Sequence, residues 1–284
     1  MSVSKVMVIG AGQMGGGIAQ VMASIGKKTY LQDVSLDIVS ARIALIDKLL
    51  TKDVGKGKIT EEKKQEVLEN LIPSADLNHA ADCDIVIEAI VENMGVKAKL
   101  FSQLDELCKA ETVLASNTSS LPITEIAAFT KRPEKVIGMH FMNPVPVMKL
   151  VEIIRGLATT DETYALVRDL TLELGKSPVE VRDVPGFVSN RVLQVMINEA
   201  IFSVYEGVAT PEGIDNVMKL GMNHPMGPLQ LADFIGLDTV LSILEIMYNG
   251  YGDPKYRPCP LLRQYVKAGW LGKKTGRGFY RYAD

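Results

Sequence analysis

A histidine and a glutamate near the middle of the chain form the pair best suited to moving a proton. His140 follows the apolar run 135–139 and precedes residues 141–146, a segment too rich in proline to continue a sheet. Glu152 lies within the apolar run 150–154, where a carboxylate is costly unless it is paired. A carboxylate on one ring nitrogen fixes the tautomer of an imidazole and favours the imidazolium. The two residues predict a general acid–base pair, although a plain salt bridge or an exposed edge-strand acid also fits the pattern.

The other two histidines carry a weaker signal. His79 precedes a buried strand and His224 lies in a proline-rich turn, so we expect a structural role for both. Two polar segments are better placed to contact a substrate oxygen: residues 116–120, at the end of a predicted strand, and Asn190, at the start of a predicted helix. Hydroxyl and amide groups there can hold a carbonyl or an alkoxide beside the base, or serve as helix caps and turn residues.

A glycine-rich segment near the N-terminus predicts a dinucleotide site. Its GxGxxG pattern lies between a predicted strand and a helix, and an acid, Asp33, ends the next strand. Such a loop lets backbone N–H groups and a helix N-terminus approach a pyrophosphate. Because a carboxylate binds a ribose 2′-hydroxyl and repels a 2′-phosphate, and no arginine directly follows Asp33, we expect NAD rather than NADP. The predicted cofactor loop contains Gly10, Ala11, Gly12, Gln13, Met14 and Gly15.

The segments that must position these residues alternate between two periodicities. Helical patterns at 96–107 and 123–129 lie between short apolar runs, which favours βαβ units and a parallel sheet. Beyond Val184 strand signals largely vanish. The predicted strands are 5–9, 28–33, 84–89, 112–116, 135–139 and 150–154, and the predicted helices of the later part are 188–205, 212–220 and 229–248.

We therefore expect an α/β chain of two domains. A Rossmann-type NAD-binding domain would span residues 1–184, with an insertion of two charged amphipathic helices at about 35–71. An all-helical domain would span residues 185–284. Its helices are unusually apolar for exposed elements, which predicts a homodimer interface.

The overall composition narrows the class of protein. The 284 residues carry 31 lysines and arginines against 34 acids, a formal net charge of −3, which argues against nucleic-acid binding through a global positive charge. No stretch approaches the ~18 uninterrupted apolar residues that a membrane span needs, and the strand-like start predicts no signal peptide. Three widely spaced cysteines argue against a disulfide framework or a zinc site. A cytoplasmic protein without a metal is the expectation.

Several blocks along the chain resemble one family, the short-chain 3-hydroxyacyl-CoA dehydrogenases, and most closely the monofunctional 3-hydroxybutyryl-CoA dehydrogenases of butyrate-forming anaerobic bacteria. The linker block and the block containing HFMNPVP are specific to this family, whereas the glycine loop is not. The similar blocks are GAGQMGGGIAQ, IVIEAIVEN, SNTSSLPITEIA, GMHFMNPVPVMKLVEII, DVPGFVSNRV, HPMGPLQLADFIGLD and GKKTGRGFYRY.

The resemblance implies a role for individual residues. His140 would be the base and Glu152 its orienting partner, with Ser119 and Asn190 binding the 3-oxygen and the thioester end of the substrate. The glycine loop and Asp33 would hold the adenosine and pyrophosphate of NAD. The nicotinamide side would be formed by Glu92, Lys97, Ser119, Asn143 and Lys274. From the residues alone, Glu92 is equally a helix-start acid, Lys97 an exposed helical base and Lys274 a solvated C-terminal lysine.

The resemblance also implies a substrate and an assembly. The 35–71 insertion would close over coenzyme A, and we single out Lys56 as a phosphate partner, although interleaved acids make a solvated helix face nearly as good an explanation. The reaction would be reversible hydride transfer at C3 of a short-chain 3-hydroxyacyl-CoA, in butyrate or butanol fermentation or in fatty acid metabolism, by a homodimer. Two alternatives stay open: a dehydrogenase of free 3-hydroxy or sugar acids, and a non-catalytic, crystallin-like relative.

Overall fold

The chain folds into two compact units, Met1–Asp183 and Val184–Asp284. The computed structural model describes residues 3–282. Within that range no helix has both the length and the apolar character needed to cross a membrane.

The first unit is built on one eight-stranded sheet of order β3-β2-β1-β4-β5-β6-β7-β8. All neighbouring strands are parallel except β6 and β7, so the predicted parallel sheet contains one antiparallel pair. The strands are β1 (Lys5–Ile9), β2 (Lys28–Gln32), β3 (Leu71–Ser74), β4 (Ile85–Glu88), β5 (Val113–Ser116), β6 (Val136–Phe141), β7 (Leu150–Arg155) and β8 (Ser177–Arg182).

The chain order reverses between β1 and β4, which lie side by side. Ile9 at the end of β1 pairs with Gln32 of β2 on one side and with Glu88 of β4 on the other. Three carboxyl ends therefore meet at one edge of the sheet, where open α/β sheets bind their ligands. This arrangement confirms the predicted Rossmann-type fold.

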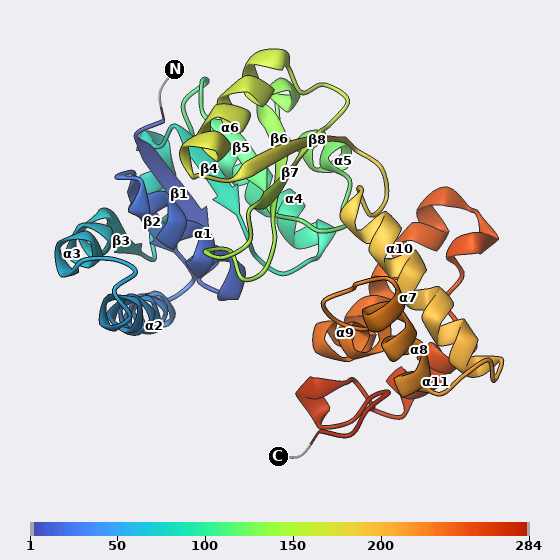
Figure 1. The fold of residues 1–284 in the computed structure, drawn as a ribbon. Coiled ribbons are helices and arrows are strands. Elements are labelled where there is room, and N and C mark those ends of the chain that lie inside the picture. The colour runs from blue at the N-terminus through green and yellow to red at the C-terminus, as the bar shows by residue number, and fades with distance from the viewer. Residues whose placement is uncertain (1–2, 283–284) are drawn as a thin grey trace. The chain divides into compact units, whose positions relative to one another are not determined.

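Helices pack on the sheet through their apolar faces, and four of those described begin with a side-chain cap. Ser35, Thr60, Asn93 and Thr160 each accept a hydrogen bond from a backbone N–H of the first turn that follows. Figure 1 shows α2 and α3 side by side next to α1. The helices are α1 (Gln13–Ser24), α2 (Leu36–Gly55), α3 (Glu61–Asn70), α4 (Met94–Leu107), α5 (Ile123–Ala127) and α6 (Asp161–Glu173), with short 3-10 turns at Leu77–Asp82 and Pro133–Lys135.

The second unit is helical around its own apolar core. The predicted helix 229–248 is two helices, because Gly236 adopts a positive φ of 102° that ends the first of them. Similarly, the predicted helix 212–220 is α8 followed by a π turn. The elements are α7 (Ser189–Tyr205), α8 (Pro211–Asn216), the π turn Val217–Gly221, α9 (Pro228–Ile235), α10 (Leu237–Tyr251), α11 (Pro260–Lys267) and 3-10 turns at Pro254–Tyr256 and Lys273–Thr275.

Candidate active site

The glycines of the loop after β1 differ in whether the protein itself leaves room for a side chain. A Cβ added to Gly15 would lie 1.7 Å from the Gly10 carbonyl oxygen, and one added to Gly10 would lie 2.5 Å from that of Ala89. The fold itself therefore requires these two glycines. A Cβ on Gly12 would meet nothing within 4 Å, so the protein does not exclude a side chain there. The bare, open backbone at Gly12 fits the close approach of a pyrophosphate.

Asp33 lies directly beside this loop. One carboxylate oxygen accepts a hydrogen bond from the Ala11 N–H at 2.7 Å, and the other accepts one from the Val34 N–H at 2.7 Å. A carboxylate oxygen can accept two bonds, so both keep capacity for ribose hydroxyls. The carbonyl of Ala11 in turn accepts a bond from Arg42 Nε of α2 at 2.9 Å. The sequence pattern around Asp33 does not reveal the contact of Arg42 with this loop, because Arg42 lies in the following helix and not directly after Asp33.

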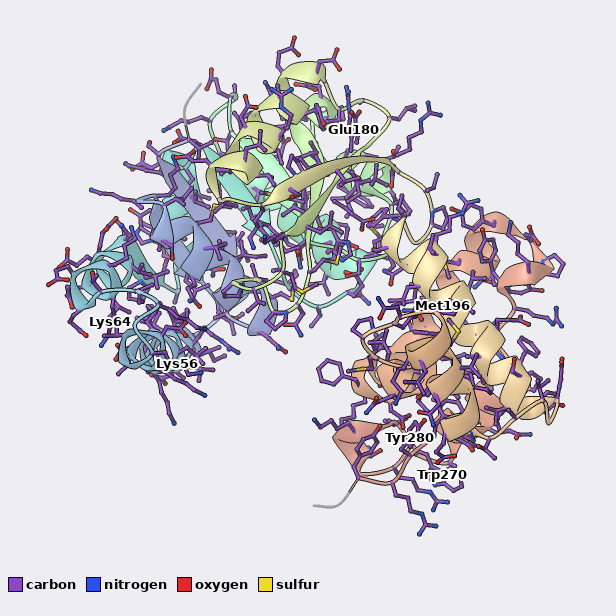
Figure 2. All side chains as sticks on the ribbon, in the orientation of Figure 1. Lys56, Lys64, Glu180, Met196, Trp270 and Tyr280 are labelled. Atoms are coloured by element: carbon purple, nitrogen blue, oxygen red, sulfur yellow. The ribbon has the colours of Figure 1, made fainter. Side chains whose placement is uncertain are left out.

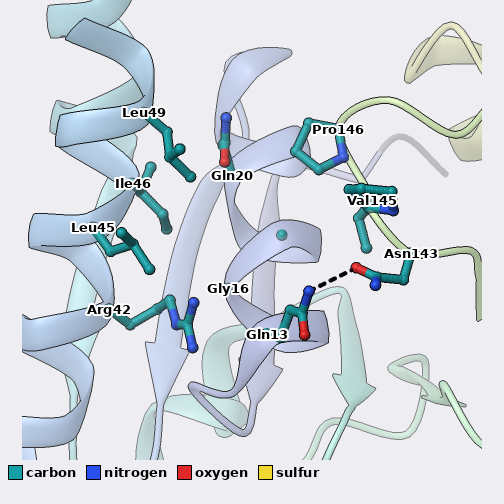
Figure 3. Close-up of a pocket in the computed structure, with 12 residues that line it drawn as sticks. Gln13, Gly16, Gln20, Arg42, Leu45, Ile46, Leu49, Asn143, Val145 and Pro146 are labelled. Carbon is teal, nitrogen blue, oxygen red and sulfur yellow. Dashed lines mark hydrogen bonds between the residues drawn. The ribbon is translucent and has the colours of Figure 1, made fainter. Parts of the chain in front are cut away.

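A hollow of about 320 Å³ opens between α1, α2 and the loop after β6 (Figure 3). Its α2 wall consists of the apolar Leu45, Ile46 and Leu49 and of Arg42, and its opposite wall is the loop 143–146. Gln13 donates from Nε2 to Asn143 Oδ1 at 3.0 Å, which joins the cofactor loop to the loop after β6. The hollow is thus apolar on one side and polar toward the glycine loop.

The predicted acid–base residues face each other across the antiparallel strands. His140 of β6 and Glu152 of β7 are register partners, and His140 Nδ1 lies 2.8 Å from Glu152 Oε2. Their side chains are 6% and 2% exposed. A carboxylate in its ionised form only accepts, so with ionised Glu152 the proton of this hydrogen bond belongs to Nδ1. The expectation that the strand ends at residue 139 is wrong, since β6 continues through His140 to Phe141.

The second ring nitrogen of His140 meets a serine. Ser119 Oγ lies 3.0 Å from His140 Nε2. The loop that carries Ser119 leaves the end of β5 and runs beside β6. The three side chains thus form a chain Glu152–His140–Ser119, in which a hydroxyl or a substrate oxygen at Nε2 can exchange a proton with the ring.

Glu92 binds the loop of residues 117–120, here called the serine loop. Its Oε1 accepts from the Thr118 hydroxyl at 2.5 Å, the Ser119 N–H at 3.0 Å, and the Ser120 N–H and hydroxyl at 3.1 and 3.0 Å. Its Oε2 lies 3.3 Å from Lys97 Nζ. Burial acts to raise the pKa of the Glu92 carboxyl, but the Lys97 charge and the loop hydrogen bonds outweigh it and lower the pKa below its ordinary value. Glu92 is therefore ionised at neutral pH.

Comparisons with known proteins decide the family. The family model described as 3-hydroxyacyl-CoA dehydrogenase, NAD binding domain, matches residues 5–184, and the one described as 3-hydroxyacyl-CoA dehydrogenase, C-terminal domain, matches residues 186–282. The chain belongs to the 3-hydroxyacyl-CoA dehydrogenase family. The resemblance seen in the sequence blocks is confirmed.

Individual relatives match over the full length of this dehydrogenase. It is 62% identical to the probable 3-hydroxybutyryl-CoA dehydrogenase of Bacillus subtilis (strain 168), over 100% of this chain and 99% of the relative. It is 51% identical to the 3-hydroxybutyryl-CoA dehydrogenase of Clostridioides difficile, over 98% and 99%. The solved structure of (S)-3-hydroxybutyryl-CoA dehydrogenase from Ralstonia eutropha matches with a TM-score of 0.98 at 49% identity, covering 100% of both chains. The chain is an NAD-dependent oxidoreductase, as the cofactor prediction expected.

Lys97 of the dehydrogenase does not have the exposure that a surface lysine would have. It lies on α4 with 1% exposure, and its Nζ is 2.5 Å from Glu88 Oε1. The alternative of an exposed helical base is wrong, because two carboxylates hold the ammonium below the surface. Glu88 was not among the predicted site residues, although it is an acid inside the apolar run 84–89, which is the signal that singled out Glu152.

A buried lysine holds the loop after β6. Lys176 Nζ donates to the carbonyls of Val145 at 2.6 Å and Met148 at 2.7 Å, and burial lowers its pKa. This segment begins with Asn143, one of the predicted cofactor residues. Nothing in the sequence pattern around Lys176 marks it, because its partners are backbone carbonyls.

Two predicted site residues belong to the second unit of the dehydrogenase. Asn190 is buried in the first turn of α7, where its Oδ1 accepts from Gln194 Nε2 at 3.4 Å. Lys274 Nζ donates to Asp238 Oδ2 at 2.6 Å, so it is an ion-paired lysine that is partly exposed. The proposed contacts of both residues with substrate and cofactor stay predictions.

Lys56 lies at the end of α2 with its side chain exposed to solvent (Figure 2). Neighbouring cations are engaged with acids: Lys58 Nζ lies 3.1 Å from Asp53 and Lys64 Nζ 3.0 Å from Asp47. The α2–α3 pair thus combines ion-paired and open cations, and the role of Lys56 stays a prediction. Among residues 3–282, no group of three or more His, Cys, Asp or Glu side chains is arranged to hold a metal.

Proposed function

We propose that this dehydrogenase interconverts 3-hydroxybutyryl-CoA and acetoacetyl-CoA, with NAD(H) as the hydride carrier. The observation that supports this most directly is the buried chain Glu152–His140–Ser119, which leaves one ring nitrogen of His140 beside a hydroxyl. The names of the full-length relatives in Bacillus subtilis and Clostridioides difficile support the same substrate.

Proton transfer falls to His140. NAD(H), when bound, would supply the hydride acceptor or donor for C3 of the substrate. During oxidation, His140 Nε2 removes the proton of the 3-hydroxyl, and Glu152 stabilises the positive charge that develops on the ring. During reduction, the protonated ring returns that proton to the oxygen. Ser119 and Asn190 hold the oxygen by hydrogen bonds during both directions.

Cofactor binding is proposed for the glycine loop Gly10–Gly15 and for Asp33, on the support of the open face at Gly12 and the free capacity of the Asp33 carboxylate. A further set of residues is proposed for the nicotinamide side. These are Glu92, Lys97, Ser119, Asn143 and Lys274.

Coenzyme A binding is proposed for the α2–α3 insertion, with Lys56 as one phosphate partner. The net charge of −3 cannot attract a polyanionic ester, so locally placed lysines have to do so. We propose a homodimer through the second unit, supported by apolar side chains exposed on its surface: Val192, Leu220, Met222 and Phe234. We also propose that the enzyme is cytoplasmic and acts in fatty acid or butyrate metabolism. The three buried, free cysteines support a reducing compartment.

The test is oxidation of NADH by acetoacetyl-CoA and by acetoacetate at equal concentration. We expect turnover with the CoA ester and a kcat/KM at least about 100-fold lower with the free acid, because the acid lacks every contact of the CoA moiety. Comparable values for both would favour the dehydrogenase of free 3-hydroxy acids. Absence of turnover with any acyl-CoA, by a protein that still binds NADH, would favour the non-catalytic relative.

A further inference from the structure

The most deeply buried charge of the first unit lies beside the proposed site and has no part in the proton transfer described above. Glu88 is the last residue of β4, between β1 and β5, and its side chain is 0% exposed. Its Oε1 accepts from the Ile90 N–H at 2.7 Å and from Lys97 Nζ at 2.5 Å. Its Oε2 accepts from the Ser116 hydroxyl at 2.6 Å.

Two routes lead from Glu88 to the serine loop. The first runs through Ser116, whose Oγ also accepts the Thr118 N–H at 3.2 Å. The second runs through Lys97 to Glu92, and from Glu92 Oε1 to four donors on residues 118–120. Both routes end on the loop that sets Ser119 against His140 Nε2.

A buried ion pair of this kind is weak evidence for stability, because the cost of removing two charges from water offsets most of their attraction. Its effect is instead geometric: the Glu88 carboxylate accepts three hydrogen bonds on its two oxygens and fixes the donors around it. Removing Glu88 would leave Lys97 with Glu92 alone and would free the Ser116 hydroxyl to rotate. The loop would keep the hydrogen bond from the Asn117 N–H to the Glu88 carbonyl at 2.8 Å, but it would lose both connections to the Glu88 side chain.

We propose that Glu88 is a positioning residue, which through Ser116 and through Lys97–Glu92 holds the loop 117–120 so that Ser119 meets His140. This inference rests on the proposed function only for its kinetic readout. Glu88 itself touches neither ring nor hydroxyl of the acid–base pair.

The main variant is Glu88→Gln, which keeps the size of the side chain and removes its charge. We expect kcat with acetoacetyl-CoA to fall at least about tenfold, since sub-ångström to 1 Å misplacement of a reacting group costs up to about 100-fold. The Kd of NADH, measured by fluorescence without substrate, should rise by a smaller factor than kcat falls, although Lys97 and Glu92 are also proposed nicotinamide contacts. Ser116→Ala removes only one route in a smaller change and should lower kcat about threefold.

A matched control comes from the same helix as Lys97. Asp105 of α4 pairs with Arg132 Nε at 2.7 Å and is also largely buried, away from the serine loop. Asp105→Asn should lower the melting temperature as Glu88→Gln does and leave kcat near the wild-type value. If Glu88→Gln lowers only the melting temperature, or mainly weakens NADH binding, the proposal fails.

The decisive step is a double-mutant cycle. If Glu88 acts through the position of Ser119, Glu88→Gln should cost less than about twofold in a Ser119→Ala background. A full tenfold loss in that background would show that Glu88 acts elsewhere.

An independent readout uses the ring nitrogens of His140, since the chain has only three histidines. In ¹⁵N-histidine NMR spectra, Glu88→Gln should shift the His140 Nε2 signal, and Asp105→Asn should leave it in place. This experiment needs no turnover, so it decides the role of Glu88 even if acetoacetyl-CoA proves not to be a substrate. An unchanged Nε2 signal in Glu88→Gln would overturn the proposal.

Discussion

Each unit of the dehydrogenase buries a pair of carboxylates, and their partners differ in kind. In the first unit, Glu152 faces the ring of His140 and Glu88 faces the ammonium of Lys97. In the second unit, Asp215 and Asp233 are 2% and 0% exposed but have no such partner among the described residues. All four groups pay a similar desolvation penalty, so burial alone does not separate them.

The second-unit carboxylates serve as ties between segments. Asp233 of α9 accepts from the N–H groups of Phe279 and Tyr280 at 3.0 and 2.9 Å and from the Tyr282 hydroxyl at 3.1 Å. Asp215 accepts from the Tyr280 hydroxyl at 2.7 Å and from two N–H groups at the start of α9. Burial raises the pKa of Asp233. Asp215 and Asp233, which accept from amide N–H groups and tyrosine hydroxyls, hold the C-terminal segment in place. Glu152 and Glu88, which pair with a histidine and a lysine, lie at or beside the proposed reacting groups.

The largest expected effect tests the first half of this comparison. His140→Ala should lower kcat by about 10²–10⁴, because it removes the group that moves the proton. The Kd of NADH should stay close to the wild-type value, whereas the melting temperature should fall, because the buried Glu152 loses its imidazole partner. Steady-state kinetics with acetoacetyl-CoA, together with fluorescence titration of NADH, check this. Turnover within tenfold of wild type would remove His140 from the mechanism.

The second prediction tests the scaffold half. Asp233→Asn places an amide N–H against donors, so the free energy of unfolding of the second unit should fall by about 1–3 kcal/mol. Since the single tryptophan, Trp270, lies in this unit (Figure 2), its fluorescence in a urea titration reports the change. Glu212→Gln, at an exposed position of α8, is the control and should leave the transition in place. A large loss of kcat in folded Asp233→Asn would break the comparison.

The smallest effect is a difference in pH dependence. The pKa of Glu92 lies below its ordinary value of 4.5, so its ionised contacts stabilise the fold above that pH and lose their contribution as the pH falls. The cost of Glu92→Gln should therefore be larger at pH 7 than at pH 4. Because Glu92 is 36% exposed, the difference should stay below about 1 kcal/mol.

Asp233 should show the opposite slope. Its pKa lies above the ordinary 3.8, so the fold favours its protonated form and loses that contribution as the pH rises. The cost of Asp233→Asn should accordingly shrink between pH 4 and pH 7. Urea titrations of both variants at the two pH values, followed by circular dichroism, give the two slopes. Slopes of equal sign would contradict the distinction between the two carboxylates.

The sheet could be predicted from sequence wherever its strands are buried on both faces. Central strands such as β1 and β4 are continuous apolar runs, and these were found within a residue or two. The strands β3 and β8 were missed, because each contains a proline and β8 is largely exposed. The break at Gly236 was missed as well, since one glycine inside an apolar stretch does not by itself reveal a positive φ.

The candidate site was predictable where a rule about burial applied to a single residue. A carboxylate in an apolar strand needs a partner, and this rule singles out Glu152. The same rule applies to Glu88. The burial of Lys97 and the bond from Arg42 to Ala11 could not be predicted, because each depends on how separate elements pack. Periodicity describes one element at a time and gives no information on such contacts.

The antiparallel pairing of β6 and β7 has a consequence for how this scaffold can change. His140 and Glu152 meet because they are register partners in the antiparallel ladder, on either side of the segment 142–149 that joins the strands. That same segment forms one wall of the hollow beside the glycine loop. Replacements of side chains at 143–146 can reshape the space offered to a ligand without changing the strand pairing that brings His140 to Glu152. In this dehydrogenase the strands β6 and β7 carry the proton-transfer pair, and the loop between them forms part of the wall of the hollow.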